Sequence, residues 1–170
     1  MDKNLSAFEP NRLYLNRGGI AFHDATWLSP AGTVADGRGS IAADLDGDLA
    51  PDILARNIGG GPVQIFLNRF PPAGRLVVRL RGTRSNRMGI GARISVEAGP
   101  LRLMRDLFPS NSHVTQQPSE VEFGLGAARS VDLLRIRWPS GHVQEMRDIP
   151  AGQRIVVTEG DPTYTRIASR

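Results

Sequence analysis

The amino-acid sequence predicts an all-β protein, and three observations lead to this prediction. Glycine and proline interrupt the chain roughly every 8 to 12 residues, a spacing typical of short strands joined by turns. The segments between these breaks carry alternating or β-branched apolar residues. No segment keeps the helical period of apolar residues. The 170 residues suffice for one ordinary domain or two small ones, and without cysteine they offer neither disulfides nor thiolate metal sites.

The first half of the chain contains four predicted strands, at residues 12–16, 39–43, 53–57 and 63–68. We expect them to form one small four-stranded antiparallel sheet within residues 1–69. The tripeptide Leu-Asn-Arg ends the first strand at residues 15–17 and follows the core of the fourth at residues 67–69, as the ends of two successive repeats would. Two prolines in residues 70–74 then mark a linker, because proline cannot donate to a strand ladder.

The second half carries a longer series of predicted strands. Several of them alternate arginine with aliphatic residues, which places the arginines on one face of a sheet and the core on the other. This pattern predicts a β-sandwich or barrel over residues 75–160, with residues 161–170 as a C-terminal tail. The strands are expected at residues 75–81, 92–98, 101–107, 121–125, 131–138, 143–149 and 153–159.

An acidic loop, DLDGDLAPD, separates the second and third predicted strands. Asp44, Asp46, Asp48 and Asp52 stand at its positions 1, 3, 5 and 9, so four carboxylates would converge and repel one another without a cation. Calcium takes about six to eight oxygen ligands, which this spacing supplies together with the carbonyl of Ala50 at position 7. The sequence therefore predicts a calcium site here. The alternative is a solvated aspartate and glycine turn between two strands.

Two residues distinguish this loop from related calcium loops. An EF-hand needs a glutamate at position 12, where this chain has Ala55, and strands rather than helices flank the loop, so we exclude an EF-hand. Position 6, where such loops use glycine for a sharp turn, is Leu49. The sequence leaves open how strongly this leucine reduces calcium affinity.

The densest basic feature of the sequence surrounds Arg81, Arg84 and Arg87, with hydroxyl and amide side chains between them. Guanidinium groups beside hydroxyls suit a carboxylate, a sulfate or an acidic surface of another protein. We therefore consider these arginines candidate contacts for an anion or a partner. The same segment also fits a structural turn, in which Asn86 and Gly89 satisfy the backbone, and both interpretations stay open.

Charge and missing motifs argue against several classes of function. The net charge of +4 combines −2 in residues 1–70 with +6 in residues 71–170, but few aromatic residues offer stacking platforms, so we do not expect nucleic-acid binding. His23, His113 and His142 are far apart, and hydrolase and phosphate-loop motifs are absent. We predict a protein without enzymatic activity. The chain contains no apolar run that could cross a bilayer and no secretory signal.

Two stretches of the sequence resemble known families. Residues 37–57, GRGSIAADLDGDLAPDILARN, are similar to one FG-GAP or VCBS-type β-propeller repeat. Residues 79–99, RLRGTRSNRMGIGARISVEAG, resemble part of the ASPIC/UnbV domain, which usually ends proteins of the cartilage acidic protein family. The blocks VEFGLGAARSVDLLRIRWPSGHVQEM at residues 121–146 and VVTEG at residues 156–160 follow in the order of that domain.

The resemblance implies one four-stranded propeller-type blade followed by a β-sandwich domain. It also implies an extracellular or periplasmic calcium-binding protein, with the four aspartates and the Ala50 carbonyl as ligands, whose role is interaction. One blade cannot bury both its faces alone, so we expect an accessory subunit or the C-terminal part of a longer propeller. The basic second half suggests a protein partner with an acidic surface. The alternative is an accessory protein of a biosynthetic pathway, to which no chemistry can be assigned.

Overall fold

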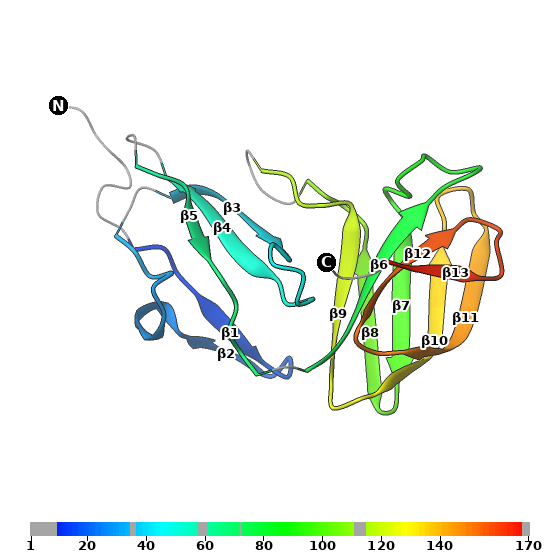
Figure 1. Cartoon of the computed structure of the whole chain (residues 1–170), viewed down its shortest axis with the longest axis horizontal. Helices are drawn as coiled ribbons and strands as arrows, with labels where there is room; N and C mark the ends of the chain where they lie inside the picture. The colour runs from blue at the N-terminus through cyan, green and yellow to red at the C-terminus, as the bar shows by residue number, and fades with distance from the viewer. Residues whose placement is uncertain (1–9, 35–36, 58–60, 72, 111–114, 168–170) are drawn as a thin grey trace.

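A computed structural model describes residues 10–34, 37–57, 61–71, 73–110 and 115–167 of the chain. Within these ranges the protein consists of thirteen β-strands and a single turn of 3-10 helix at Thr26–Leu28, which confirms the all-β prediction. The strands form a smaller N-terminal part and a larger C-terminal part (Figure 1). No helix in the described ranges has the length and apolar character that a membrane span requires.

The N-terminal part holds two small sheets instead of the single four-stranded sheet that the sequence predicted. Strand β1 (Tyr14–Arg17) pairs with β2 (Ala21–Asp24), a segment not predicted as a strand. The two are joined by a tight turn in which Gly18 and Gly19 both have positive φ, a conformation that glycine adopts without strain. This turn directs the chain back along β1, and β1 and β2 form a two-stranded sheet of their own. Strands β3 (Gly37–Ala43), β4 (Asp52–Asn57) and β5 (Gln64–Phe66) form a separate antiparallel sheet.

The C-terminal part is a sandwich of two open four-stranded sheets, with the strand orders β11-β10-β7-β8 and β13-β12-β6-β9. All seven strands predicted from the sequence are present, with ends that differ by at most a residue. The eighth, β13, lies in the segment expected to be a C-terminal tail. The strands are β6 (Gly74–Arg81), β7 (Arg93–Ala98), β8 (Leu101–Asp106), β9 (Glu120–Gly126), β10 (Ser130–Arg137), β11 (Val143–Pro150), β12 (Gln153–Thr158) and β13 (Tyr164–Ile167).

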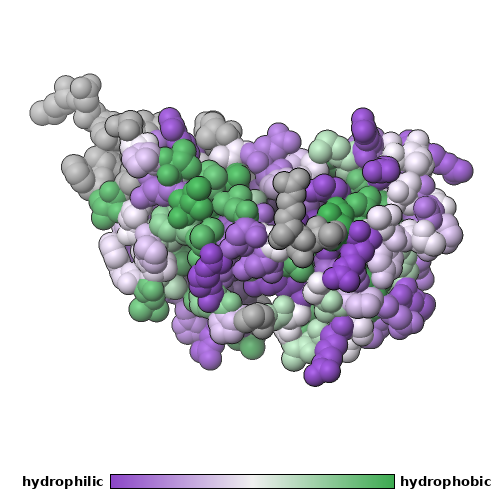
Figure 2. All heavy atoms as spheres, viewed as in Figure 1, coloured by the Kyte–Doolittle hydropathy of each residue, from purple (hydrophilic) through white to green (hydrophobic). Residues whose placement is uncertain are grey.

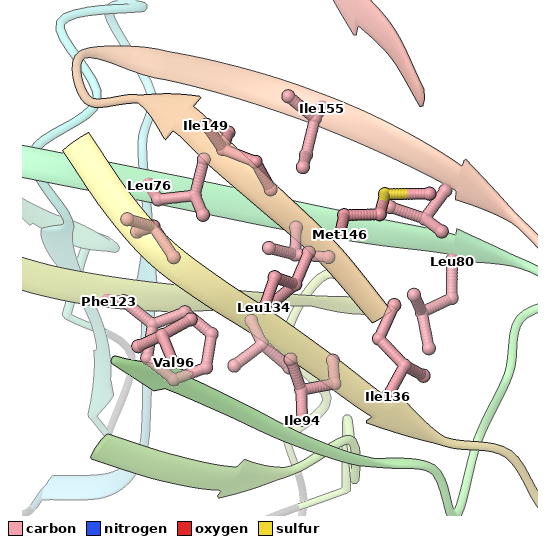
Figure 3. Packing of buried hydrophobic residues seen from close by; sticks show 14 of the residues in the cluster. Leu76, Leu80, Ile94, Val96, Phe123, Leu134, Ile136, Met146, Ile149 and Ile155 are labelled. Carbon is pink, nitrogen blue, oxygen red and sulfur yellow. The ribbon is translucent and has the colours of Figure 1, made fainter. Parts of the chain in front are cut away.

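The main apolar core lies between the two sheets of the sandwich. Side chains from β6, β7, β9, β10, β11 and β12 point toward one another there, as Figure 3 shows for Phe123, Leu134 and Ile155 among others. All buried residues of this cluster fall between Leu76 and Val157. In the described N-terminal residues, the buried apolar side chains are four alanines, at positions 25, 43, 50 and 55. Apolar burial therefore stabilises the C-terminal part far more than the N-terminal part.

The two parts meet at the outer face of the sheet that contains β12, β6 and β9. Val77 on β6 points away from the core, between Glu122 on β9 and Arg154 on β12, which are its cross-strand partners. It is nevertheless fully buried. The loop between β3 and β4 points at this face (Figure 1), and its Asp44 carboxylate forms an ion pair with Arg154. The acidic loop is therefore also a contact between the two parts.

Candidate functional site

The acidic loop, residues 44–52, leaves the end of β3 and enters the start of β4. Its aspartates shape the backbone by accepting hydrogen bonds from N–H groups within the loop. Asp44 Oδ1 accepts from Gly47 at 2.7 Å, Asp44 Oδ2 from Leu49 at 3.1 Å, and Asp48 Oδ1 from Ala50 at 2.7 Å. These bonds curl the loop so that its carboxylates face one another.

Three of the predicted ligands are brought together by this curl. One oxygen each from Asp44, Asp46 and Asp48 lies within 4.8 Å of the others. In the part of the chain that the structure describes, this is the one grouping of histidine, aspartate or glutamate with metal-ligand spacing. An irregular arrangement of three hard oxygen ligands fits calcium, which tolerates irregular geometry, better than magnesium, which demands a near-ideal octahedron.

Asp52, the predicted ligand at position 9, makes a structural contact. Its side chain is fully buried, and its two oxygens accept hydrogen bonds from the N–H groups of Leu45 at 2.9 Å and Asn68 at 2.7 Å. It thereby ties the start of the loop to the segment after β5. A carboxylate oxygen has more than one lone pair, so these bonds leave Asp52 an acceptor. Ala50, the predicted carbonyl ligand, is buried at the same end of the loop.

Leu49, at the position where related loops use glycine, adopts the left-handed conformation. Its φ is 67°, and Gly47 has φ 86°. For a leucine this conformation costs about 1 to 2 kcal/mol. The Leu49 side chain lines a small cleft whose other walls belong to the C-terminal part, including Gln153 and Ile167. Contact with the sandwich offers a physical reason for a leucine where glycine would be unstrained.

Arg69, which follows β5, reaches the exposed side of the acidic loop. Its Nη1 atom lies 2.6 Å from Asp46 Oδ2 and 3.8 Å from Asp48 Oδ2. The hydrogen bond from Arg69 lowers the pKa of Asp46, and the same bond raises the pKa of Arg69. Arg69 was not predicted from the sequence as part of the site. The Leu-Asn-Arg tripeptide that ends at this residue was the only available signal.

Arg154 contacts the loop from the opposite side. Its Nη2 atom lies 3.0 Å from Asp44 Oδ2 and 3.3 Å from Glu120 Oε1, while Glu120 also pairs with Arg79 at 3.0 Å. Burial, together with the charges of Glu120 and Asp44, raises the pKa of neighbouring Glu122 to about 7. Acidic and basic side chains from both parts therefore gather at their junction.

The predicted basic site contains an anion, and that anion is the protein's own Glu159. The buried Glu159 carboxylate accepts N–H bonds from Thr83, Arg84 and Ser85 at 2.8 to 2.9 Å and hydroxyl bonds from Ser85 and Ser140. Burial opposes ionisation, but the bonds from Ser140 and these backbone groups lower the Glu159 pKa to about 2. We call this arrangement the Glu159 clasp.

The arginines predicted as anion or partner contacts do not bind Glu159 through their guanidinium groups. Arg84 uses its backbone N–H, and the side chains of Arg81, Arg84 and Arg87 are exposed at the surface around the clasp. The clasp pins the turn between β6 and β7 to the end of β12. This arrangement supports the structural interpretation of the turn, and it leaves three guanidinium groups facing solvent.

The clasp and the strands after it carry the blocks GTRSNRMGIGAR, FGLG and RWPSG that suggested a family. Residues 82–163 match the family model of ASPIC and UnbV. The ASPIC/UnbV region thus begins at the turn that holds Glu159 and covers most of the sandwich. Among curated proteins, the comparison finds no match to this chain. The FG-GAP or VCBS-type character of residues 37–57 stays a prediction.

The histidines lie apart from the acidic loop where the structure describes them. His23 on β2 contacts Arg17 Nη1 at 3.2 Å, and His142 lines a hollow beside the Glu159 clasp of the ASPIC/UnbV region. His113 lies outside the described residues. The acidic loop with Arg69 and Arg154 is therefore the best-defined candidate site.

Proposed function

We propose that the protein is a non-enzymatic interaction module, in which a calcium-binding loop stiffens a small β-sheet that packs against a protein partner. One observation carries the proposal: the β3–β4–β5 sheet has apolar side chains on both of its faces. A sheet that ends at solvent normally has one polar face, whereas apolar residues on both faces are typical of a sheet covered on both sides.

The register of the sheet defines the two apolar rows. Ile41, Leu54 and Ile65 are cross-strand neighbours on one face, and Ala42, Ile53 and Phe66 are neighbours on the other. The first row ends at an exposed side chain, that of Ile65, which is 56% exposed. The second row lines a hollow of ≈ 550 Å³ with Asn11, Arg12 and Leu13.

Further exposed apolar residues lie on and beside the other sheet of the N-terminal part. Ile20, Phe22, Trp27 and Leu28 on and beside the β1–β2 hairpin are 67% to 93% exposed. Figure 2 shows apolar side chains gathered over the half of the molecule that holds β3, β4 and β5. Large contiguous apolar surfaces are uncommon on monomers, and they usually mark interfaces.

The occupant that fits these faces is another β-sheet layer, because flat apolar rows on strands pack best against a second sheet about 10 Å away. A preceding repeat of a longer propeller or a sheet from another subunit would both supply such a layer. The positive charge of residues 71–170 favours a partner whose facing surface is acidic. An extracellular or periplasmic location suits the calcium site that this proposal includes.

In this proposal calcium is held by Asp44, Asp46 and Asp48, with Asp52 and the Ala50 carbonyl completing the ligand set. The ion supplies positive charge to carboxylates that otherwise repel one another, and it fixes the connection between β3 and β4. Asp52 keeps the loop closed on the segment after β5, so that a stiffened loop also stiffens the edge of the sheet.

Calorimetric titration of calcium into the chelator-treated protein tests the metal proposal, with thermal unfolding in parallel. A ligand that binds only the folded state raises the melting temperature. We expect saturable binding of calcium at one site of the wild-type protein. Asp46→Asn should bind calcium at least about tenfold more weakly than the wild type. Asp132→Asn, on the far sheet of the sandwich, is the matched control. Absence of both heat and a melting shift at millimolar calcium would contradict the proposal.

Sedimentation velocity and binding of an apolar dye test the interface proposal. The exposed sheet should bind the dye or self-associate as the protein concentration rises. Ile65→Lys should reduce both effects, because a charge at the exposed end of the apolar row opposes burial of that face. Met104→Lys, at an exposed position on β8, serves as the control. A protein that stays monomeric and binds no dye at any soluble concentration would contradict the proposal of an exposed apolar sheet.

A further inference from the structure

Two arginines reach the acidic loop from opposite sides, Arg69 from the end of β5 and Arg154 from β12 in the ASPIC/UnbV region. We infer that both determine the loop's affinity for calcium, because each neutralises a carboxylate that the ion would use. In addition, Arg154 couples occupancy of the loop to the contact between the two parts of the chain. This inference rests on the calcium function proposed above.

Arg69 competes at the exposed end of the loop. Its Nη1 atom lies 2.6 Å from Asp46 Oδ2 and 3.8 Å from Asp48 Oδ2. A guanidinium and a calcium ion both seek these oxygens, so tighter binding of one weakens binding of the other. The Arg69 side chain is 62% exposed, so it has room to turn away into solvent. Arg69 reduces the calcium affinity by the free energy of the Arg69–Asp46 ion pair, because calcium must break that pair to bind.

Arg154 acts at the buried end of the loop. The Asp44 side chain is fully buried and that of Arg154 is 18% exposed, so their charges interact with little screening by water. A calcium ion on Asp44 would place a second positive charge beside the guanidinium. Repulsion between the two cations then weakens calcium binding, and it weakens the Asp44–Arg154 ion pair in return.

The surroundings of Arg154 show that its charge is shared among several carboxylates. Its Nη2 atom also faces Glu120 Oε1 at 3.3 Å, while its buried Nε has no hydrogen-bond partner. Glu122 and Asp44 lie close enough to raise each other's electrostatic energy, with Arg75 and Arg79 as the other cations. A calcium ion at the loop would place positive charge on the same carboxylate, so the ion and Arg154 are alternative counter-charges for Asp44.

Coupling between two binding events is reciprocal. If Arg154 lowers calcium affinity by a given factor, calcium lowers the strength of the Asp44–Arg154 contact by the same factor. Asp44 belongs to the N-terminal part, and Arg154 belongs to the sandwich. Calcium is therefore expected to loosen this contact between the two parts while it stiffens the loop itself.

The test is a calorimetric calcium titration of the full chain and of three variants. Arg69→Gln and Arg154→Gln should each bind calcium about 10-fold more tightly than the wild type, within the usual range of coupling between sites. Arg102→Gln is the control, because Arg102 is 61% exposed and pairs with Glu97 at 3.4 Å on the opposite sheet. It removes the same charge and should change the affinity less than about 2-fold.

A second readout covers a failure of Arg154→Gln to fold. In wild-type protein, NMR should show faster solvent exchange of the Arg154 guanidinium protons when calcium is added. Unchanged or weaker calcium affinity in a folded arginine variant, beside measurable binding by the wild type, overturns the inference and leaves the calcium function standing. Absence of calcium binding in the wild type and in all variants overturns both.

Discussion

The two parts of the chain are stabilised by different kinds of interaction. The sandwich encloses a continuous apolar cluster between its sheets, in which Leu76, Ile94 and Leu134 are fully buried. The N-terminal part buries only alanines among its described apolar residues, and it relies on polar contacts such as those of Asp52. Burial of large apolar side chains is the main favourable term in folding, so the N-terminal part depends on contacts outside itself.

The N-terminal part is therefore where interaction with a partner is expected. A sheet with apolar rows on both faces and no core of its own gains stability from whatever covers it. The Asp44–Arg154 ion pair is one such contact, because it ties the loop of this sheet to the sandwich. The remaining exposed rows are the surface that a partner would cover.

Truncation of one aromatic residue in each part gives the largest contrast. Phe123 is 1% exposed within the core of the sandwich, whereas Phe66 on β5 is only partly buried. Phe123→Ala should lower the free energy of unfolding by about 3 to 5 kcal/mol, and Phe66→Ala by less than about 2 kcal/mol. Urea unfolding monitored by tryptophan fluorescence measures both. Equal losses would mean that the N-terminal sheet is as well packed as the sandwich.

Removal of the Glu159 clasp should produce the next largest effect. Glu159→Gln loses the charge that accepts three backbone N–H bonds and two hydroxyl bonds, so we expect a loss of about 2 kcal/mol at neutral pH. Because the folded pKa lies near 2, below the ordinary 4.5, this stabilisation is present above pH 4.5 and disappears as pH falls toward 2. The two proteins should therefore converge in stability under acid. A difference in the free energy of unfolding between the two proteins that does not change with pH would show that the Glu159 charge is not the stabilising feature.

Asp52→Asn tests the polar support of the N-terminal part. The amide retains one oxygen, so one of the N–H groups of Leu45 and Asn68 loses its acceptor, at a cost of about 1 to 2 kcal/mol. Hydrogen exchange should accelerate at these two amides and leave the sandwich unchanged. Asp161→Asn, in a turn of the sandwich, controls for the loss of a carboxylate. Acceleration spread evenly over both parts would show that the chain unfolds as one unit.

Glu122→Gln probes the junction between the two parts. Burial first, and then the charges of Glu120 and Asp44, raise the pKa of Glu122 from 4.5 to about 7. A raised carboxyl pKa stabilises the fold below pH 4.5, and this contribution is lost as pH rises through 7. Glu122→Gln should therefore match the wild type near pH 4 and exceed it by about 1 kcal/mol at pH 8, after allowance for partial exposure. Thermal unfolding across this range gives the answer, and greater stability of the wild type at pH 8 would reverse the assignment.

The sequence predicted the sandwich well, because alternation of arginine with aliphatic residues reports directly which face of a strand is buried. The pairing of the N-terminal strands was not predictable in this way. The glycine turn at residues 18–19 sends the chain into the β1–β2 hairpin, and β2 has no buried side chain to reveal it. Strand β13 was missed for a similar reason, since it is an edge strand with half its residues exposed.

In the acidic loop, too, local features were predictable from the sequence and distant contacts were not. Local spacing was sufficient to predict that Asp44, Asp46 and Asp48 converge, because hydrogen bonds within a few residues shape the loop. The contact with Arg154 spans 110 residues of sequence, and no local pattern contains it. The anion at the basic turn was likewise supplied by a distant residue, Glu159. Contacts of this length depend on how the strands are ordered in space.

Hydrogen exchange of the full chain, measured with and without calcium, distinguishes a weakly packed N-terminal part from one as stable as the sandwich. Amides of β3, β4 and β5 should exchange at least about a hundredfold faster than those of β6 and β10, because local opening requires little apolar exposure there. Calcium should slow exchange in the acidic loop and the adjoining strand ends only. Equal protection of both parts, or protection by calcium confined to the sandwich, would contradict the account.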